Sequence, residues 1–102
     1  RKIVSGQLVG QEVDLTIVEL TASGGYLVED HGVVLSVGND AQDLILEYGR
    51  DFESLRKGFG SIHSIKLDGR EIYRNDAVVG PIPRHALRPM GEIRQSGRWY
   101  LG

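Results

Sequence analysis

The segment 39–59, NDAQDLILEYGRDFESLRKGF, decides the fold class that the sequence predicts. Asn39 or Asp40 suits the start of a helix, because a short polar side chain accepts hydrogen bonds from the free amides of the first turn. Apolar residues then follow at spacings of three and four, which is typical of one face of an amphipathic helix. This stripe consists of Ala41, Leu44, Ile45, Tyr48, Phe52, Leu55 and Phe59.

Gly49 lies inside this predicted helix. A glycine in a helix interior costs about 1 kcal/mol relative to alanine. The helix therefore either continues to about Lys57 or stops at Tyr48 and restarts after Asp51, and the sequence leaves both open. We expect a continuous helix, because the apolar stripe keeps its phase across the glycine.

The residues before this segment predict an antiparallel meander of about four strands. Gly10-Gln11 is expected to form a two-residue turn between strands 2–9 and 12–19, because glycine suits the first position of a type II′ turn. In this register the apolar residues share one face, and an ion pair closes the far end. The pairs on that face are Leu8/Val13, Gly6/Leu15, Val4/Ile17 and Lys2/Glu19.

Two further glycine turns continue the predicted meander. Ser23-Gly24-Gly25 leads into strand 26–30, and His31-Gly32 leads into strand 33–37. Short glycine turns favour antiparallel neighbours, because parallel strands need a much longer crossover connection.

Two hairpins are expected near the carboxyl end. Asp68-Gly69 is the strongest short hairpin signal in the chain, and Ser96-Gly97 is a similar one. All three prolines lie between them, so this stretch is expected to be irregular or to form a sheet edge. The predicted pairs are Leu67/Arg70, Lys66/Glu71, Ile65/Ile72, Ser64/Tyr73 and His63/Arg74 in the first hairpin, and Gln95/Arg98, Arg94/Trp99 and Ile93/Tyr100 in the second.

These elements together predict one α+β domain over residues 1–102, with the amphipathic helix packed on the meander and the two hairpins extending the sheet. Partial closure into a barrel is compatible with this pattern. A chain of 102 residues is the size of one ordinary domain.

The composition excludes several kinds of site. The chain has no cysteine, so it has neither a disulfide framework nor a thiolate metal site. No cofactor motif is present, and no apolar run is long enough to span a membrane. We expect a cytoplasmic protein, and we interpret Arg1 at the first position as a sign of a fragment or a processed chain.

Catalysis is the least favoured class of function. His31 and His85 are expected to be ordinary loop residues, because each lacks the further ligands or the orienting partner that a metal site or a general base needs. His63 opposite Arg74 is the one pair that suggests chemistry, as in a small nuclease. A histidine packed at the edge of the core is the commoner role for such a residue.

Charge is distributed unevenly along the chain. Residues 1–49 hold two basic and eight acidic residues, whereas residues 50–102 hold ten basic and six acidic residues. Arginine and aromatic side chains also gather near the carboxyl end, and these residue types concentrate binding energy at protein interfaces. The predicted binding residues are Arg84, Arg88, Arg94, Arg98, Trp99 and Tyr100.

We therefore expect a non-catalytic protein-binding module, such as an inhibitor, immunity, adaptor or assembly protein. Its contact surface is either the arginine and aromatic hairpin or the acidic amino-terminal meander. Weak nucleic-acid binding through the basic stretch is the alternative, although a sequence pI near 5.9 is low for that role. A homodimer formed through exposed hairpin edges is also open.

Overall fold

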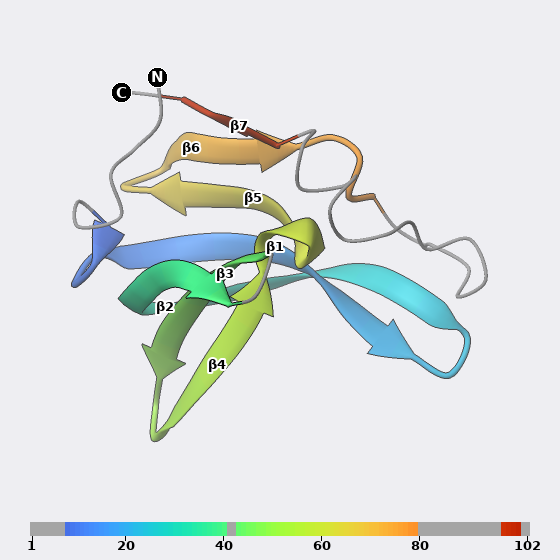
Figure 1. Cartoon of the computed structure of the whole chain (residues 1–102), viewed down its shortest axis with the longest axis horizontal. Coiled ribbons are helices and arrows are strands. Elements are labelled where there is room, and N and C mark those ends of the chain that lie inside the picture. The colour runs from blue at the N-terminus through green and yellow to red at the C-terminus, as the bar shows by residue number, and fades with distance from the viewer. Residues whose placement is uncertain (1–7, 41–42, 80–96, 101–102) are drawn as a thin grey trace.

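The computed structural model describes residues 8–40, 43–79 and 97–100, and these residues form one antiparallel sheet (Figure 1). Its seven strands run in the order β4-β3-β2-β1-β5-β6-β7. Figure 1 shows β4 and β7 at opposite ends of this sheet. The strands are β1 (Glu12–Thr21), β2 (Gly24–Asp40), β3 (Asp43–Arg50), β4 (Glu53–Gly58), β5 (Ile62–Leu67), β6 (Arg70–Asn75) and β7 (Gly97–Trp99).

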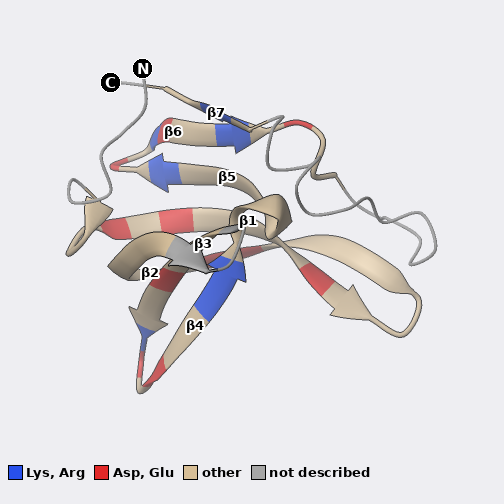
Figure 2. Ribbon diagram, viewed as in Figure 1, with Lys and Arg blue, Asp and Glu red and all other residues tan. Residues whose placement is uncertain are grey.

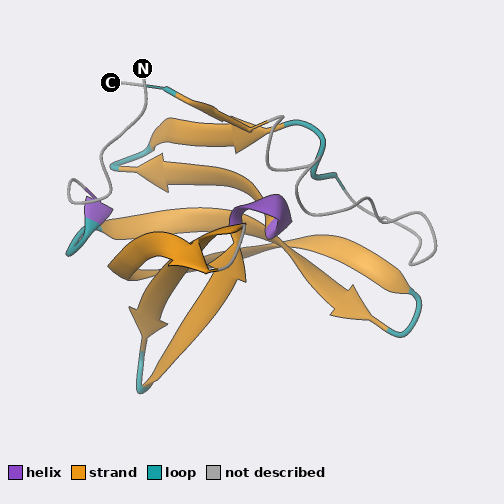
Figure 3. Cartoon of the chain, in the orientation of Figure 1, coloured by secondary structure: helices purple, strands orange, loops and turns teal. Residues whose placement is uncertain are grey.

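The predicted amphipathic helix is wrong, and with it the α+β class. Segment 43–58 is a hairpin of β3 and β4, closed by a two-residue turn at Asp51-Phe52. Helical backbone in the described residues is limited to Leu8 and the 3₁₀ turn η1 (Phe59–Ser61), and Figure 3 shows how little of the chain it occupies.

The true period in this segment is two. Leu46 and Tyr48 are completely buried and Leu44 packs against the same core, so alternate side chains point inward as a strand requires. Phe52, a member of the predicted helical stripe, is instead fully exposed at the turn. Residues 44 and 48 fit both periods, which is why the pattern was ambiguous.

The predicted turn at His31-Gly32 is also wrong, because β2 passes through these residues without interruption. A Cβ atom on Gly32 would lie 2.6 Å from the carbonyl oxygen of Gly49 and 2.8 Å from Cδ2 of Tyr48. Glycine is therefore needed here for a close approach of β2 to β3, and not for a change of direction.

β2 changes partners near its middle. Its first part pairs with β1, from Thr21↔Gly24 to Glu12↔Val33. Its second part pairs with β3, from Val33↔Gly49 to Asp40↔Asp43. The turn between β1 and β2 is formed by Ala22 and Ser23, so the turn predicted at Ser23-Gly24-Gly25 is right only at Ser23, and Gly24 and Gly25 already belong to β2.

The predicted hairpin around Gly10-Gln11 is wrong, because β1, its described strand, pairs with β2 and β5 instead. Leu15 pairs with Asp30 on one side and with Ile65 of β5 on the other. A strand has only two edges, so Leu15 has no edge left for Gly6. The other half of this predicted hairpin, residues 1–7, lies outside the described residues.

The predicted turn at Asp68-Gly69 is confirmed. Both residues have positive φ, 54° and 78°, as a type I′ turn requires. Leu67↔Arg70 and Lys66↔Glu71 pair as predicted, but an irregularity then shifts the register, so that Ile65 pairs with Tyr73 and Ser64 with Arg74. The predicted partners of Ile65, Ser64 and His63 are therefore wrong by one residue.

The second predicted hairpin is only half described. Residues 93–96 lie outside the described ranges, whereas Gly97–Trp99 form β7 and pair with β6 in the register Tyr73↔Trp99, Arg74↔Arg98 and Asn75↔Gly97. The three prolines also lie outside the described residues.

One face of the curved sheet carries the main core, to which β1, β2, β3, β5 and β6 all contribute. Phe59 of η1 packs on this core near β6 and β7, since its ring lies edge-on against Tyr73, with centroids 5.2 Å apart, and 5.5 Å from Trp99. The buried apolar residues of the main core are Leu8, Val13, Leu15, Ile17, Val34, Leu46, Tyr48, Phe59, Ile62, Ile65, Ile72 and Tyr73.

Candidate functional site

The predicted carboxyl-terminal surface is described for three of its six residues. Arg84, Arg88 and Arg94 lie outside the described residues. Arg98 and Tyr100 are exposed, whereas Trp99 is half-buried and packs on Tyr73, with ring centroids 4.9 Å apart. The tryptophan thus has a structural role at the edge of the core. The binding surface as a whole stays a prediction.

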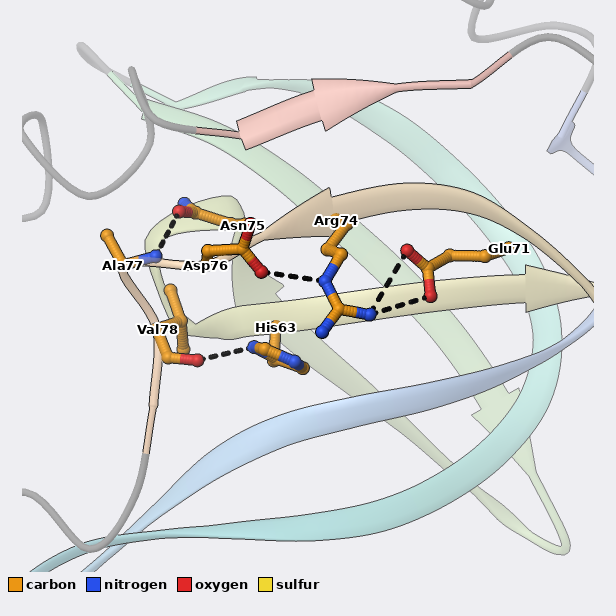
Figure 4. A network of polar contacts seen from close by, with 7 residues as sticks. All are labelled: His63, Glu71, Arg74, Asn75, Asp76, Ala77 and Val78. Carbon is orange, nitrogen blue, oxygen red and sulfur yellow. Dashed lines mark hydrogen bonds and ion pairs between the residues drawn. The ribbon is translucent and has the colours of Figure 1, made fainter.

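Arg74 pairs with Ser64 of β5 and not with His63, and the hydrogen bonds drawn in Figure 4 join each of the two side chains to other residues. His63 donates its Nδ1 proton to the carbonyl oxygen of Val78. Arg74 donates from Nε to Asp76 Oδ1 at 2.7 Å and from Nη1 to Glu71 Oε2 at 3.1 Å. These hydrogen bonds hold both His63 and Arg74, the pair that suggested nuclease chemistry.

The contacts in Figure 4 hold the chain that follows β6. The Asn75 side-chain oxygen accepts a hydrogen bond from the Ala77 amide at 3.1 Å. The hydrogen bond from Arg74 lowers the pKa of Asp76, and the same bond raises the pKa of Arg74. This network holds residues 75–78 against the sheet.

Acidic side chains gather along β1 and the facing part of β2. Figure 2 shows this band, with basic segments on β5, β6 and β7 to one side of it. Glu12 and Asp14 lie on β1, and Asp14 pairs directly with His31 of β2. The acidic half of the sequence is therefore also an acidic region of the folded sheet.

A cleft of about 710 Å³ opens at one end of this acidic band, where the β3–β4 turn approaches β1 and β2. Its position follows from the change of partner in β2, since Glu12, Val33 and Gly49 meet there. The lining residues are Glu12, His31, Gly32, Val33, Gly49, Arg50, Asp51, Phe52, Glu53 and Ser54.

Phe52 is the most unusual residue of the cleft. It is fully exposed at the tip of the β3–β4 turn, although burial of a phenylalanine side chain contributes about 1.5–3 kcal/mol. Val33 also lines the cleft and is exposed, and Leu35, the next residue but one, is exposed as well. A contiguous exposed apolar patch rimmed by polar residues commonly marks an interaction site.

Asp30 holds the β2 side of the cleft to the β3 side. Its carboxylate accepts hydrogen bonds from the Tyr48 hydroxyl at 2.7 Å and from the His31 amide at 2.9 Å, and it lies 3.2 Å from Nε of Arg50. Arg50 Nη2 in turn lies 3.5 Å from Glu53 on the rim. The β3–β4 turn is thereby tied to the middle of β2.

The protonation state of the Asp30 carboxylate follows from its contacts. Burial alone would raise the pKa of Asp30, but the hydrogen bonds from Tyr48 and His31, together with the charge of Arg50, lower it below its ordinary value. Burial, and then the hydrogen bond to Asp30, raise the pKa of Tyr48. Asp30 is therefore a fixed negative charge at neutral pH.

A second cleft of about 310 Å³ adjoins the first, and His31 lines both. Its polar lining includes Asp14, Glu29 and Lys66. In the described ranges, however, no three histidine and carboxylate residues are placed to hold a metal ion. The second cleft therefore extends the acidic surface without offering a metal centre.

In comparisons with known proteins, no family model, no curated protein and no solved structure matches this chain. Within the described ranges, no helix has both the length and the apolar character needed to cross a membrane. The site must therefore be interpreted from its own geometry.

Sequence reasoning missed the exposure of Phe52, because the helical stripe placed its ring in the core. The signal that could have found it is Asp51, which has a φ of 54° at the turn. Aspartate tolerates this left-handed conformation better than most residues. An Asp directly after Gly49-Arg50 is therefore as consistent with a turn as with a continuing helix.

Proposed function

We propose that this protein is a non-catalytic protein-binding module, and that its contact surface is the acidic cleft beside Phe52. The favoured partner is a segment of another protein that presents an apolar side chain flanked by lysine or arginine. The observation that carries the proposal is the full exposure of Phe52 next to a cleft of about 710 Å³.

Charge complementarity supports a basic partner. The cleft is lined by the three carboxylates of Glu12, Asp51 and Glu53 against the single guanidinium of Arg50. Arg50 already lies beside Asp30 and Glu53, so its charge is largely compensated. Acidic surfaces attract basic partners and repel others, which contributes to specificity.

Apolar contact supplies the second part of the argument. Aromatic residues at the centre of interfaces commonly dominate the binding energy, because a large ring becomes buried with little loss of rotamer freedom. Phe52 and Val33 both line the cleft, together with Gly32 and Gly49, which have no side chains. A partner side chain that enters the cleft therefore has the apolar groups of Phe52 and Val33 among its possible contacts.

The same observations disfavour phosphate ligands. Carboxylates on the rim repel a nucleic-acid backbone, whose phosphates need lysine or arginine partners. Arg74, which pairs with Arg98 of the predicted basic surface, is held by Asp76 and Glu71. Protein binding thus remains the better proposal for this surface.

A peptide selection tests the proposal. We expect a displayed library of random short peptides to yield binders in which an aromatic or aliphatic residue lies next to lysine or arginine. Phe52→Ser should weaken these binders by about tenfold or more, as expected for loss of a central aromatic contact. Fluorescence anisotropy or calorimetry on the purified protein measures the change.

The matched control is Val79→Ser, which removes another exposed apolar side chain at a position that does not line the cleft. This variant should bind the selected peptides like the unmodified protein. Absence of any enriched peptide, or equal affinity for Phe52→Ser and the unmodified protein, contradicts the proposal.

A further inference from the structure

The first half of β2 has one strand edge that is unpaired in the described part of the sheet. β2 pairs with β1 from Gly24 onward, but β3 joins its other side only at Val33. Figure 1 shows the β1–β2 hairpin projecting beyond the other strands as a two-stranded ribbon. Proteins usually protect such an edge with lysine, proline or a covering segment, because free main-chain groups can pair with another chain. Residues 24–29 contain neither lysine nor proline.

The hydrogen bonds of β2 show which main-chain groups point outward from this edge. The Val34 amide donates to the carbonyl oxygen of Gln11 at 2.9 Å, on the β1 side of the strand. β1 and β2 stay in register from there to the turn, and main-chain groups alternate in direction along a strand. Gly25, Leu27 and Glu29 therefore direct their amides and carbonyl groups away from β1.

The free part of this edge has a defined end. The next outward amide, that of His31, donates to the carboxylate of Asp30 at 2.9 Å and is not available to another strand. The edge that can accept a further strand therefore consists of residues 25–29, and we call it the β2 edge.

Apolar side chains flank the β2 edge on both faces of the ribbon. Tyr26 and Val28 lie on one face and are 40% and 37% exposed. Leu27 lies on the other face, where it is partly buried against Val18 and Val78. A strand added at this edge would remove apolar surface from water on both faces, which favours association.

Two copies of the β2 edge are complementary when they lie antiparallel about Leu27. Leu27 then lies opposite Leu27 of the second copy, and Tyr26 lies opposite Val28 of the second copy. Aromatic and β-branched side chains stabilise neighbouring strands when they are directly opposed. Glu29 lies opposite Gly25, which has no side chain, so no two like charges are opposed.

Other registers are worse. A shift by one residue sets outward-pointing groups against inward-pointing ones, so the ladder cannot form. A shift by two residues in one direction places Leu27 opposite Gly25, and its apolar partner is lost. The opposite shift places Leu27 opposite Glu29 and Tyr26 opposite Asp30. The register about Leu27 is thus the one that opposes apolar side chains on both faces.

We propose that two copies of this chain associate through their β2 edges in the register centred on Leu27. The two sheets then form one continuous sheet, related by a two-fold axis. This inference goes beyond the proposed function, since none of residues 25–29 lines the cleft beside Phe52.

A proline substitution tests the main-chain contact. Glu29→Pro removes an amide that points away from β1, and edge strands tolerate proline at such a position. Glu29→Ala is the matched control, because it removes the same side chain and keeps the amide. We expect sedimentation to show the unmodified protein and Glu29→Ala at twice 11.3 kDa at high concentration, with the association of Glu29→Pro weakened about tenfold or more.

Cysteine pairing tests the register and does not depend on proline. The chain has no cysteine of its own, so introduced thiols have no competitor. In the proposed register Tyr26 and Val28 of the second copy form a pair whose Cα atoms lie about 4.5 Å apart, a distance that a disulfide spans. A mixture of Tyr26→Cys and Val28→Cys should therefore give disulfide-linked dimers with oxidised glutathione. Each variant alone should give few, because identical positions lie diagonally, about 7–8 Å apart.

Three outcomes overturn the inference: an unmodified protein that stays monomeric up to millimolar concentration, equal association of Glu29→Pro and Glu29→Ala, or no more cross-linking in the mixture than in each cysteine variant alone. Circular dichroism verifies that each variant is folded. Phe52→Ser separates this inference from the proposed function. It should abolish peptide binding and leave sedimentation unchanged, whereas Glu29→Pro should do the reverse.

Discussion

At the scale of single residues, Gly32 and Asp30 decide how β2 packs against β3 around Tyr48. Gly32 has no side chain, and Asp30 carries a charge. The side chain is absent at Gly32 because β2 and β3 approach closely over Tyr48. Asp30, two residues earlier, fills the space beside the same tyrosine with a carboxylate that accepts its hydroxyl proton in a hydrogen bond. The two residues together allow Tyr48 to be completely buried without leaving its hydroxyl unpaired.

Gly32→Ala should destabilise the protein by about 1–3 kcal/mol, the usual cost of forcing an extra carbon into a packed site. The added Cβ would lie 2.6 Å from a backbone oxygen that cannot easily move. Gly38→Ala on the same strand is the control, because nothing lies within 4 Å of its Cβ position. Urea denaturation measures both, and equal stability of the two variants contradicts this account of β2.

Asp30→Asn should lower the free energy of unfolding at neutral pH by about 1–3 kcal/mol, since it removes charge-assisted hydrogen bonds from a nearly buried site. The pKa of Asp30 is lowered in the folded protein, so the unfolded chain binds a proton more readily as the pH falls. The stability that Asp30 contributes is therefore present above about pH 4 and is lost below it.

Unfolding curves measured at several pH values check the direction in which stability changes with pH. The unmodified protein should lose stability as the pH falls through about 4, and Asp30→Asn should lose less. Tyr48→Phe should act in the same direction, because it removes one donor to Asp30. Tyr26→Phe, which removes a hydroxyl that contacts exposed Ser23, is the matched control and should change little.

At the scale of elements, the sequence predicts only some of the turns, since the turn expected at His31-Gly32 is absent and the turn at Asp51-Phe52 was assigned to a helix. Asp68-Gly69 forms the expected turn, because two adjacent positions of positive φ restrict the choice of residues strongly. The helix prediction was wrong because Leu44, Ile45 and Tyr48 satisfy a period of 3.6 while Leu44, Leu46 and Tyr48 satisfy a period of two. Pairing with β2, the preceding strand, decides between them.

The aromatic contact between η1 and the last strands gives a test at this scale. Phe59→Leu should cost about 1–2 kcal/mol, since aromatic pairs contribute about 0.5–1.5 kcal/mol beyond the area they bury. Trp99 is the only tryptophan, and its ring centroid lies 5.5 Å from that of Phe59, so its emission should shift to longer wavelength in the variant.

Phe52→Leu is the matched control, because the other phenylalanine of the chain is fully exposed and takes no part in this cluster. Its stability and tryptophan emission should equal those of the unmodified protein. An unchanged emission spectrum in Phe59→Leu argues against close packing of η1 on β7.

At the scale of the whole molecule, the uneven charge of the sequence predicts the acidic surface but not its shape. The carboxylates of the first half do gather, along β1 and β2. The cleft at the end of this band depends on where β3 and β4 turn, and the sequence pattern assigned that turn to a helix. A surface made by residues 12, 33 and 52 cannot be deduced without the strand pairing that brings them together.

The change of pairing partner along β2, from β1 to β3, has a consequence for how this protein can evolve. The hollow arises from the path of the main chain, since one adjoining strand begins where the other stops. Under the proposed function, substitutions at its rim therefore alter what is recognised without closing the hollow or disturbing the interior. Glu12, Phe52 and Ser54 are then the positions at which a relative of this chain, or a designed variant, would acquire a different specificity on an unaltered framework.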